Sequence, residues 1–180
     1  MITIIFEAHG TTFDNEARRA SGHNDIALSL LGEQQSKEMG ERHANDHFDA
    51  IFCSDLQRAY KSAEIGFGDK WPIVKDARLR ECDYGDYTQH PSEEVEAQKP
   101  LCITEPFPNG ESYTQTTERM RSFLEDLLKN YDGKKVMLIG HRATQYGLDH
   151  LINGVPLETL VASKFKWQPG WMYEFKGFKE

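Results

Sequence analysis

Two histidines of the chain, His9 and His141, each follow a short apolar segment of the sequence. Those segments are residues 2–6 and 135–139, and both have the apolar, β-branched character of buried strands. A neutral imidazole can attack phosphorus, and the covalent intermediate divides one difficult displacement into two easier ones. The two histidines are therefore candidates for phosphoryl-transfer chemistry.

Phosphoryl transfer also requires a cation that binds phosphate oxygens and a group that moves protons. Arg58 lies in the segment Ser-Asp-Leu-Gln-Arg-Ala at residues 54–59, and Glu81 follows Leu79 and Arg80. The planar guanidinium group of arginine binds phosphate oxygens with a fixed geometry and keeps its charge at every working pH. A carboxyl group can protonate the departing alkoxide and then deprotonate the attacking water. These residue types predict phosphoryl transfer that needs no metal ion.

Strand and helix patterns alternate along the chain, and this order predicts the elements that bring the candidate side chains together. Strands are predicted at residues 2–6, 50–53, 73–74, 135–139 and 172–175, and helices at residues 30–47, 55–65, 92–98, 111–131 and 144–152. The alternation predicts an α/β fold, a three-layer α/β/α sandwich with a mainly parallel central sheet. Ligands bind beyond the carboxyl ends of parallel strands, so His9, Ser54 and His141 are expected at one edge of the sheet.

The segments that carry these residues, taken in order, resemble the histidine phosphatase superfamily, which includes cofactor-dependent phosphoglycerate mutases and many small phosphatases. The matching segments are residues 8–35, 54–59, 79–85, 108–112 and 136–141. Any one of them is a weak signal, whereas the ordered set with preserved spacing is specific. The resemblance implies a phosphoglycerate mutase-like fold and a histidine phosphatase-like domain, which we expect to be a single domain over residues 1–180.

The resemblance also implies a role for each matching residue. His9 would form the phosphohistidine, and His141 would stabilise the transferring group. Arg58 would bind the phosphate, and Glu81 would be the general acid and base. Three further residues match positions that help to hold the phosphate or the rest of the substrate: Asn15, Arg19 and Ser54.

One residue departs from the superfamily pattern. The residue before the nucleophilic histidine is expected to be arginine, and here it is Ala8. Loss of a phosphate-binding cation would remove roughly 2–4 kcal/mol of transition-state stabilisation, by analogy with the loss of an oxyanion donor. Arg142, which follows the second histidine, is a candidate to reach into the space that Ala8 leaves and to bind substrate there.

Composition limits the partners and the location of the protein. The chain has 180 residues and a formal net charge of −8, which disfavours binding to the phosphate backbone of nucleic acid. No apolar run approaches the ~20 residues of a membrane helix, so no membrane association is expected. The three cysteines, Cys53, Cys82 and Cys102, form neither a disulfide framework nor a zinc-ligand pattern, which favours a cytoplasmic location. A small phosphorylated substrate is still expected, because an acidic protein can contain a local basic pocket.

The leading prediction is a cofactor-free, metal-independent phosphatase that hydrolyses a small phosphomonoester through a phosphohistidine on His9. A mutase with the same chemistry is the first alternative, although mutases of the superfamily are longer than this chain. A catalytically impaired member that binds a phosphorylated ligand is the second alternative, because of Ala8. Whether the protein is a monomer or a homodimer is left open.

Several further residues are open to either a structural or a functional interpretation. The specificity loops are expected within residues 82–112, where Glu105 and Glu111 would disfavour a strongly anionic substrate if they faced the pocket. His43 and His47 have a spacing that can bind zinc, but solvent exposure is expected because no third ligand lies nearby. Three aromatic residues lie near the end of the sequence: Trp167, Trp171 and Tyr173. They are expected to form a hydrophobic edge of the fold, with the wall of a ligand site as the alternative.

Overall fold

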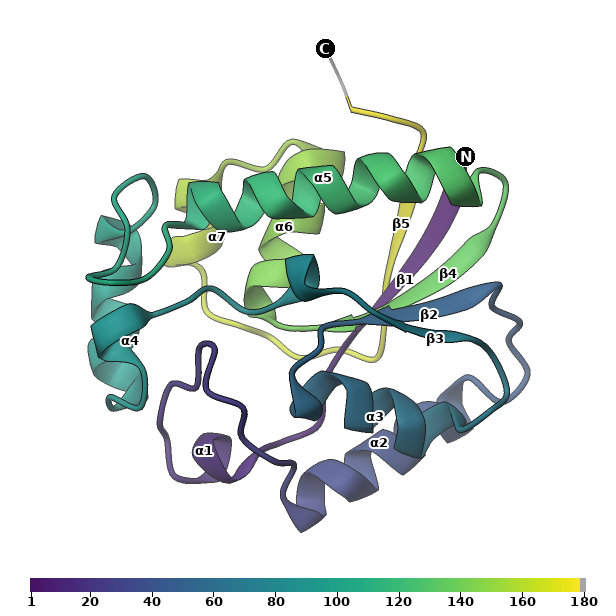
Figure 1. Ribbon diagram of the computed structural model, residues 1–180, viewed down its shortest axis with the longest axis horizontal. Helices are drawn as coiled ribbons and strands as arrows, with labels where there is room; N and C mark the ends of the chain where they lie inside the picture. Colours follow the sequence, from purple (N-terminus) through teal and green to yellow (C-terminus); the bar gives the residue numbers. More distant parts are fainter. Residues whose placement is uncertain (179–180) are drawn as a thin grey trace.

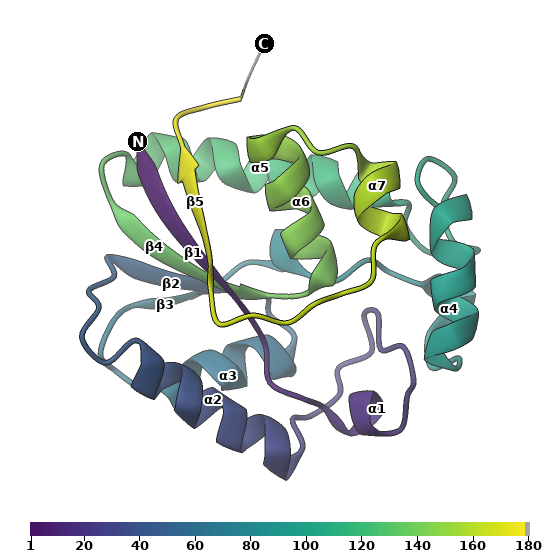
Figure 2. The same cartoon turned by 180° about the vertical axis from the view of Figure 1, so that it is seen from behind.

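The computed structural model describes residues 1–178 and contains a central five-stranded sheet (Figures 1 and 2). The strands are β1 (Ile2–Ala8), β2 (Ala50–Cys53), β3 (Ile73–Lys75), β4 (Lys135–Gly140) and β5 (Trp171–Phe175). Their order across the sheet is β3-β2-β4-β1-β5, and β5 alone runs antiparallel to its neighbour. The carboxyl ends of the four parallel strands therefore meet at one edge of the sheet, as predicted.

Helices cover both faces of this sheet. They are α1 (Phe13–Glu16), α2 (Leu30–Arg42), α3 (Gln57–Phe67), α4 (Ser92–Gln98), α5 (Tyr113–Tyr131), α6 (Arg142–Asn153) and α7 (Leu157–Ala162). Single 3₁₀ turns lie at Ala77–Leu79, Gly85–Tyr87 and Lys99–Leu101. Helices α2 and α3 lie on one face, and α5 and α6 lie on the other (Figures 1 and 2). The arrangement confirms the predicted three-layer α/β/α sandwich with a mainly parallel sheet.

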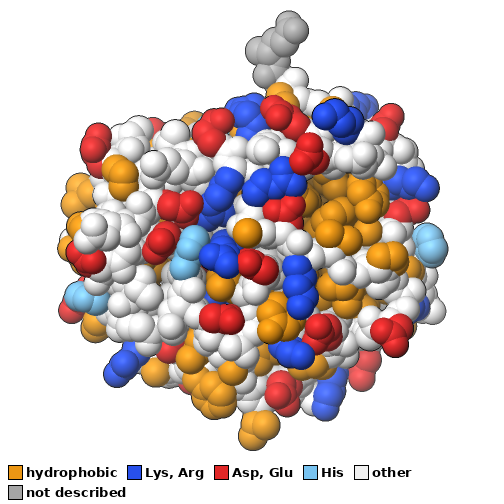
Figure 3. Space-filling model, in the orientation of Figure 1, with side chains coloured by type: hydrophobic (Ala, Val, Ile, Leu, Met, Phe, Trp, Pro, Cys, Tyr) orange, Lys and Arg blue, Asp and Glu red, His pale blue; other side chains and the backbone are white. Residues whose placement is uncertain are grey.

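The apolar pattern of each element explains which face it covers. Strand β4 lies in the middle of the sheet and is buried on both sides, which accounts for its continuous apolar run. Helix α5 begins with a capping box between Ser112 and Gln115, and its Met120 and Leu124 pack onto the sheet at helical spacing. Charged side chains of both signs are interspersed over the outer surface seen in Figure 3.

Several element boundaries differ from the predicted ones for identifiable reasons. Helix α2 ends at Arg42 instead of residue 47, because the His43 ring turns inward and bonds to Glu7 and Asp46. The predicted exposure of His43 is wrong, since only 12% of its side chain is accessible, whereas His47 is exposed as predicted. Strand β1 continues through Glu7, a buried carboxylate whose partners were not evident from the sequence.

Among residues 1–178, no helix is long and apolar enough to cross a membrane. All three cysteines are buried free thiols. The predicted single domain of residues 1–180 includes two residues outside the described part of the chain. The extent of that domain and the cytoplasmic location stay predictions.

Candidate active site

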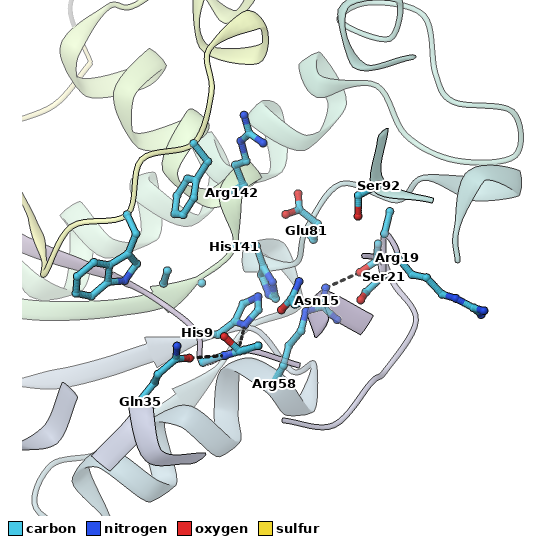
Figure 4. A pocket seen from close by; sticks show the side chains of 18 of the residues that line it. His9, Asn15, Arg19, Ser21, Gln35, Arg58, Glu81, Ser92, His141 and Arg142 are labelled. Carbon is cyan, nitrogen blue, oxygen red and sulfur yellow. Dashed lines mark hydrogen bonds between the residues drawn. The ribbon is translucent and has the colours of Figure 1, made fainter. Parts of the chain in front are cut away.

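A cavity of about 600 Å³ opens at the carboxyl ends of β1 and β4. Its lining includes His9 and His141 from the loops after these strands, together with Arg58 from the first turn of α3 and Glu81 (Figure 4). The four residues predicted to carry the chemistry therefore come from four separate segments and meet in one place. The parallel strand order brings the two histidine loops together, because β1 and β4 are neighbours in the sheet.

The His9 imidazole is held with one nitrogen facing a carbonyl group. Its Nδ1 lies 2.7 Å from the Gly10 carbonyl oxygen, which can only accept a hydrogen bond, so Nδ1 carries the proton. Burial, with a smaller contribution from the positive charge of Arg58, lowers the pKa of His9 to about 3. The ring is therefore neutral near pH 7, and the lone pair resides on Nε2. This is the protonation state that a phosphorus nucleophile requires.

The loop that carries His9 is fixed by close contacts with α2 and α3. The Gly10 N–H donates to the Ser62 hydroxyl at 2.9 Å, and the Thr11 N–H donates to the Gln35 Oε1 at 2.8 Å. A Cβ atom at Gly10 would lie only 2.3 Å from the carbonyl oxygen of Gly32, so only glycine allows this approach to the start of α2. These contacts leave the His9 backbone little freedom to move.

His141 stands beside His9, with the two ring centroids 5.0 Å apart. Its Nε2 is 2.6 Å from the Ser54 hydroxyl, and its buried Nδ1 has no hydrogen-bond partner within the described residues. Burial, followed by the charge of Arg58, holds the pKa of His141 well below its usual range. Ser54, which was predicted to help hold the phosphate or the rest of the substrate, is fully buried and does not itself line the cavity. In this arrangement Ser54 acts through His141.

Arg58 is 98% inaccessible yet keeps donors for a ligand. Its Nη1 donates to the Asn24 carbonyl at 2.9 Å, and its Nη2 donates to the Gly22 carbonyl at 2.7 Å. A guanidinium group has five N–H donors, so three remain after these two bonds. Gly22 adopts the left-handed region (φ +52°), which presents its carbonyl to the arginine without strain. The two carbonyl groups orient Arg58 toward the cavity (Figure 4).

The Glu81 carboxylate lies across the cavity from Arg58 (Figure 4). Its Oε1 accepts hydrogen bonds from the Cys82 N–H at 2.8 Å and the Ala143 N–H at 3.2 Å. Its own backbone carbonyl accepts from Arg119 and bonds to the His23 ring, each at 2.8 Å. One carboxylate oxygen is thus held by the backbone, and the second is available for proton transfer. The sequence prediction missed Arg119 and His23, which position Glu81 without lining the cavity.

Three further residues with predicted substrate contacts line the cavity in different ways. The Asn15 Oδ1 accepts from the Thr12 N–H at 3.0 Å, so its amide nitrogen is the group left for a ligand. Arg19 is exposed at the rim, and its guanidinium group points away from His9 (Figure 4). Arg142 also points away from His9, because it binds Glu96 Oε1 at 3.0 Å and the Ser163 carbonyl at 2.5 Å. The hypothesis that Arg142 fills the space beside Ala8 is therefore wrong for this structure.

Besides α2 and residues 19–22, two further segments form the outer walls of the cavity. The predicted specificity region, residues 82–112, contributes side chains of α4 and its neighbours; they include Tyr84, Ser92, Val95, Glu96 and Lys99. Glu105 and Glu111 are not among them, and Glu111 instead pairs with Arg119 at 2.8 Å. The second segment is residues 163–170, which contributes Phe165 and Trp167. Of these two residues, the sequence indicated only Trp167 as a candidate for a ligand wall. Trp171 and Tyr173 do not line this cavity, since both pack against the sheet core.

Residues 1–178 contain no group of three or more His, Cys, Asp or Glu side chains placed to hold a metal ion. The cavity brings together two neutral histidines, a buried arginine and a carboxylate. Such a set matches the nucleophile, anion site and proton-transfer group of a phosphoryl-transfer enzyme.

Comparison with known proteins shows the superfamily of the chain. Residues 4–170 match the histidine phosphatase superfamily (branch 1), so the chain belongs to that superfamily. The uncharacterized phosphatase PhoE of Bacillus subtilis is 34% identical over 86% of this chain and 79% of its own length. The probable phosphoglycerate mutase GpmB of Erwinia tasmaniensis is 32% identical over 87% of this chain and 77% of its own. Among solved structures, Bacillus stearothermophilus YhfR superposes with a TM-score of 0.86 at 25% identity, covering 99% of this chain and 93% of that one.

Proposed function

We propose that this protein hydrolyses a small phosphomonoester through a phosphohistidine intermediate on His9. The observation that supports the proposal most strongly is the state of the His9 ring. Its Nδ1–H is bonded to the Gly10 carbonyl, its pKa is lowered to about 3, and its Nε2 lies in a cavity with Arg58 and His141. Phosphatases and phosphoglycerate mutase-like proteins both occur among the relatives, and both are compatible with this nucleophile.

In the first step, His9 Nε2 attacks phosphorus, the P–N bond forms and the ester P–O bond breaks. Glu81 in its acid form donates its proton to the departing alkoxide oxygen. The remaining N–H donors of Arg58 bind phosphoryl oxygens, and the unpartnered Nδ1 of His141 provides a further polar contact. The products are the free alcohol, the phosphohistidine and the Glu81 carboxylate.

In the second step, the Glu81 carboxylate removes a proton from water as the water oxygen attacks phosphorus. The P–N bond breaks, its electron pair returns to Nε2, and inorganic phosphate leaves. Both steps use only side chains of this chain, so the reaction needs no metal ion or cofactor. A mutase would share the first step and return the phosphoryl group to a second hydroxyl group.

The test measures phosphate release and acid-labile phosphoryl label on the protein, with a generic phosphate ester and a metal chelator present. We expect turnover and label in the unmodified protein and neither in His9→Ala. His47→Ala is the matched control, because His47 is exposed and does not line the cavity. Label without phosphate release, or transfer to an added sugar phosphate, would favour the mutase. Activity that appears only in Ala8→Arg would identify an impaired site and contradict the proposal.

A further inference from the structure

The cavity continues from His9 past Ala8 to an aromatic wall that the reaction above does not use. The residues of this extension, here called the aromatic branch, are Phe6, Ala8, Met39, Phe165 and Trp167. Ala8 directly precedes the nucleophile in the chain, so the branch begins about 4 Å of backbone away from His9. The small Ala8 side chain leaves the passage between the two regions open.

Contacts with the rest of the fold hold the aromatic branch in place. The Phe165 ring lies 6.2 Å from the Trp171 ring, which in turn lies 5.4 Å from the Phe6 ring. The Arg42 guanidinium group lies 5.6 Å from the centre of the Trp167 ring, at cation–π distance. The two aromatic side chains nevertheless remain open to the cavity side, with Phe165 42% and Trp167 59% exposed. Large aromatic groups this exposed at a cavity mouth mark a binding surface.

The charges around the aromatic branch disfavour a second anionic group on the ligand. Two cations lie beside the aromatic rings of the branch. Arg42, next to Trp167, binds the buried Glu7 carboxylate at 3.1 Å, and Arg142, 5.9 Å from the centre of the Phe165 ring, binds Glu96 at 3.0 Å. Glu38 lies on the same side of the cavity as Arg42 and adds negative charge. Lys99 shares the Glu96 carboxylate with Arg142. Both cations beside the aromatic rings are therefore already paired with carboxylates, Arg42 with Glu7 and Arg142 with Glu96.

We propose that the aromatic branch binds a flat, uncharged aromatic group of the substrate, so that the preferred substrates are phosphomonoesters with such a group close to the phosphate. This inference rests on the proposed phosphatase function and names the class of substrate. Trp167 is its principal specificity-determining residue, because its ring offers the largest open face. Stacking of two aromatic rings adds about 0.5–1.5 kcal/mol beyond burial, which corresponds to a preference of about two- to tenfold.

The test compares benzyl phosphate with propyl phosphate. Both release ordinary alcohols of similar acidity, so a difference in kcat/KM reports binding of the organic group and not the quality of the leaving group. We expect benzyl phosphate to be preferred by about two- to tenfold, mainly through a lower KM. Trp167→Ala should reduce this preference to about one, and Trp167→Phe should retain most of it.

Met172→Ala is the matched control, because Met172 is another exposed apolar residue, in β5, that does not line the cavity. It should leave the ratio of the two kcat/KM values unchanged. A ratio near one in the unmodified protein would overturn the inference. So would a loss of kcat/KM in Trp167→Ala that is equal for both substrates.

A binding measurement separates this inference from the proposed function. Benzylphosphonate and propylphosphonate have a P–C bond that cannot be hydrolysed, so calorimetric titration reports binding without turnover. Tighter binding of benzylphosphonate that depends on Trp167 supports the aromatic branch even if neither ester is hydrolysed. Hydrolysis of both esters with equal binding of the two phosphonates leaves the phosphatase proposal intact and rejects the aromatic branch.

Discussion

His9 and His43 both lie near the carboxyl end of β1, yet their surroundings drive their pKa values in opposite directions. Loss of hydration and the nearby charge of Arg58 lower the pKa of His9 to about 3, and within residues 1–178 no carboxylate pairs with its ring. The His43 ring bonds to the Glu7 carboxylate at 2.8 Å and to Asp46 at 2.7 Å, and the bond to Glu7 is the largest cause of its raised pKa. The same side chain is thus kept neutral where a nucleophile is needed and is favoured as a cation where it stabilises a buried charge.

Among the residues around His9, Arg58 is the one whose removal should reduce activity most. Arg58→Ala removes the donors for the phosphoryl group, and we expect kcat/KM to fall about a thousandfold. Arg58→Lys should recover little, because an ammonium group cannot bind two backbone carbonyls and a phosphate with the same geometry. Steady-state kinetics measure the loss, and Arg121→Ala, on the outer face of α5, is the control.

The same variant tests the electrostatic explanation directly. Without the positive charge of Arg58, the pKa of His9 should rise toward its ordinary value while burial still holds it down. Proton NMR of the imidazole C–H signals follows this titration. A His9 pKa that does not change in Arg58→Ala would show that burial alone keeps the ring neutral.

Because both cavity histidines are neutral, proton transfer to the leaving group falls to Glu81. Glu81→Gln keeps the hydrogen bonds from the Cys82 and Ala143 N–H groups but cannot donate or accept a proton in the reaction. We expect kcat for an alkyl phosphate to fall by roughly a hundredfold or more. The loss should be much smaller for p-nitrophenyl phosphate, whose leaving group needs no proton. An equal loss for both esters would mean that Glu81 acts mainly in positioning.

His9 and His43 also show which features of the site can be predicted from the sequence and which cannot. The ordered segments around His9, Arg58, Glu81 and His141 predicted which side chains meet, because a parallel sheet brings its strand ends to one edge. His43 was predicted to be exposed, since the helix pattern continues through it and its partner Glu7 lies 36 residues earlier in the chain. Pairings between distant residues, such as this one, leave no periodic signal in a single sequence.

The outer walls of the cavity were harder to predict than the catalytic residues at the strand ends, for a related reason. His9 and His141 directly follow strands of the sheet, which fixes their positions. Residues 163–170 instead form a loop without regular structure between α7 and β5. The direction of Arg142 was likewise set by Glu96 and the Ser163 carbonyl, which belong to two other segments. Local sequence patterns do not determine where such a loop lies.

The lowered pKa of His9 should also appear in the stability of the protein. Below pH 6.5 the unfolded chain takes up a proton at this position, and the folded protein does not do so until about pH 3. Stability is therefore lost as the pH falls, by about 1.4 kcal/mol per pH unit, or about 2 kcal/mol between pH 6.5 and pH 5. His9→Asn should lose about 2 kcal/mol less than the unmodified protein over that interval in urea unfolding. Parallel losses in the two proteins would mean that His9 titrates normally.

His43 should show the opposite dependence. Its pKa is raised in the folded state, so its stabilising contribution is fully present below the unfolded value of 6.5 and is lost as the pH rises through the folded value. We expect His43→Gln to be less stable than the unmodified protein at pH 5.5 by about 1.5 kcal/mol, the size of a hydrogen bond to a charged group. The difference should shrink as the pH is raised to 9, because the imidazole loses its proton in that direction. If instead the difference were the same at both pH values, the pairing with Glu7 would depend on shape and hydrogen bonding and not on the charge of His43.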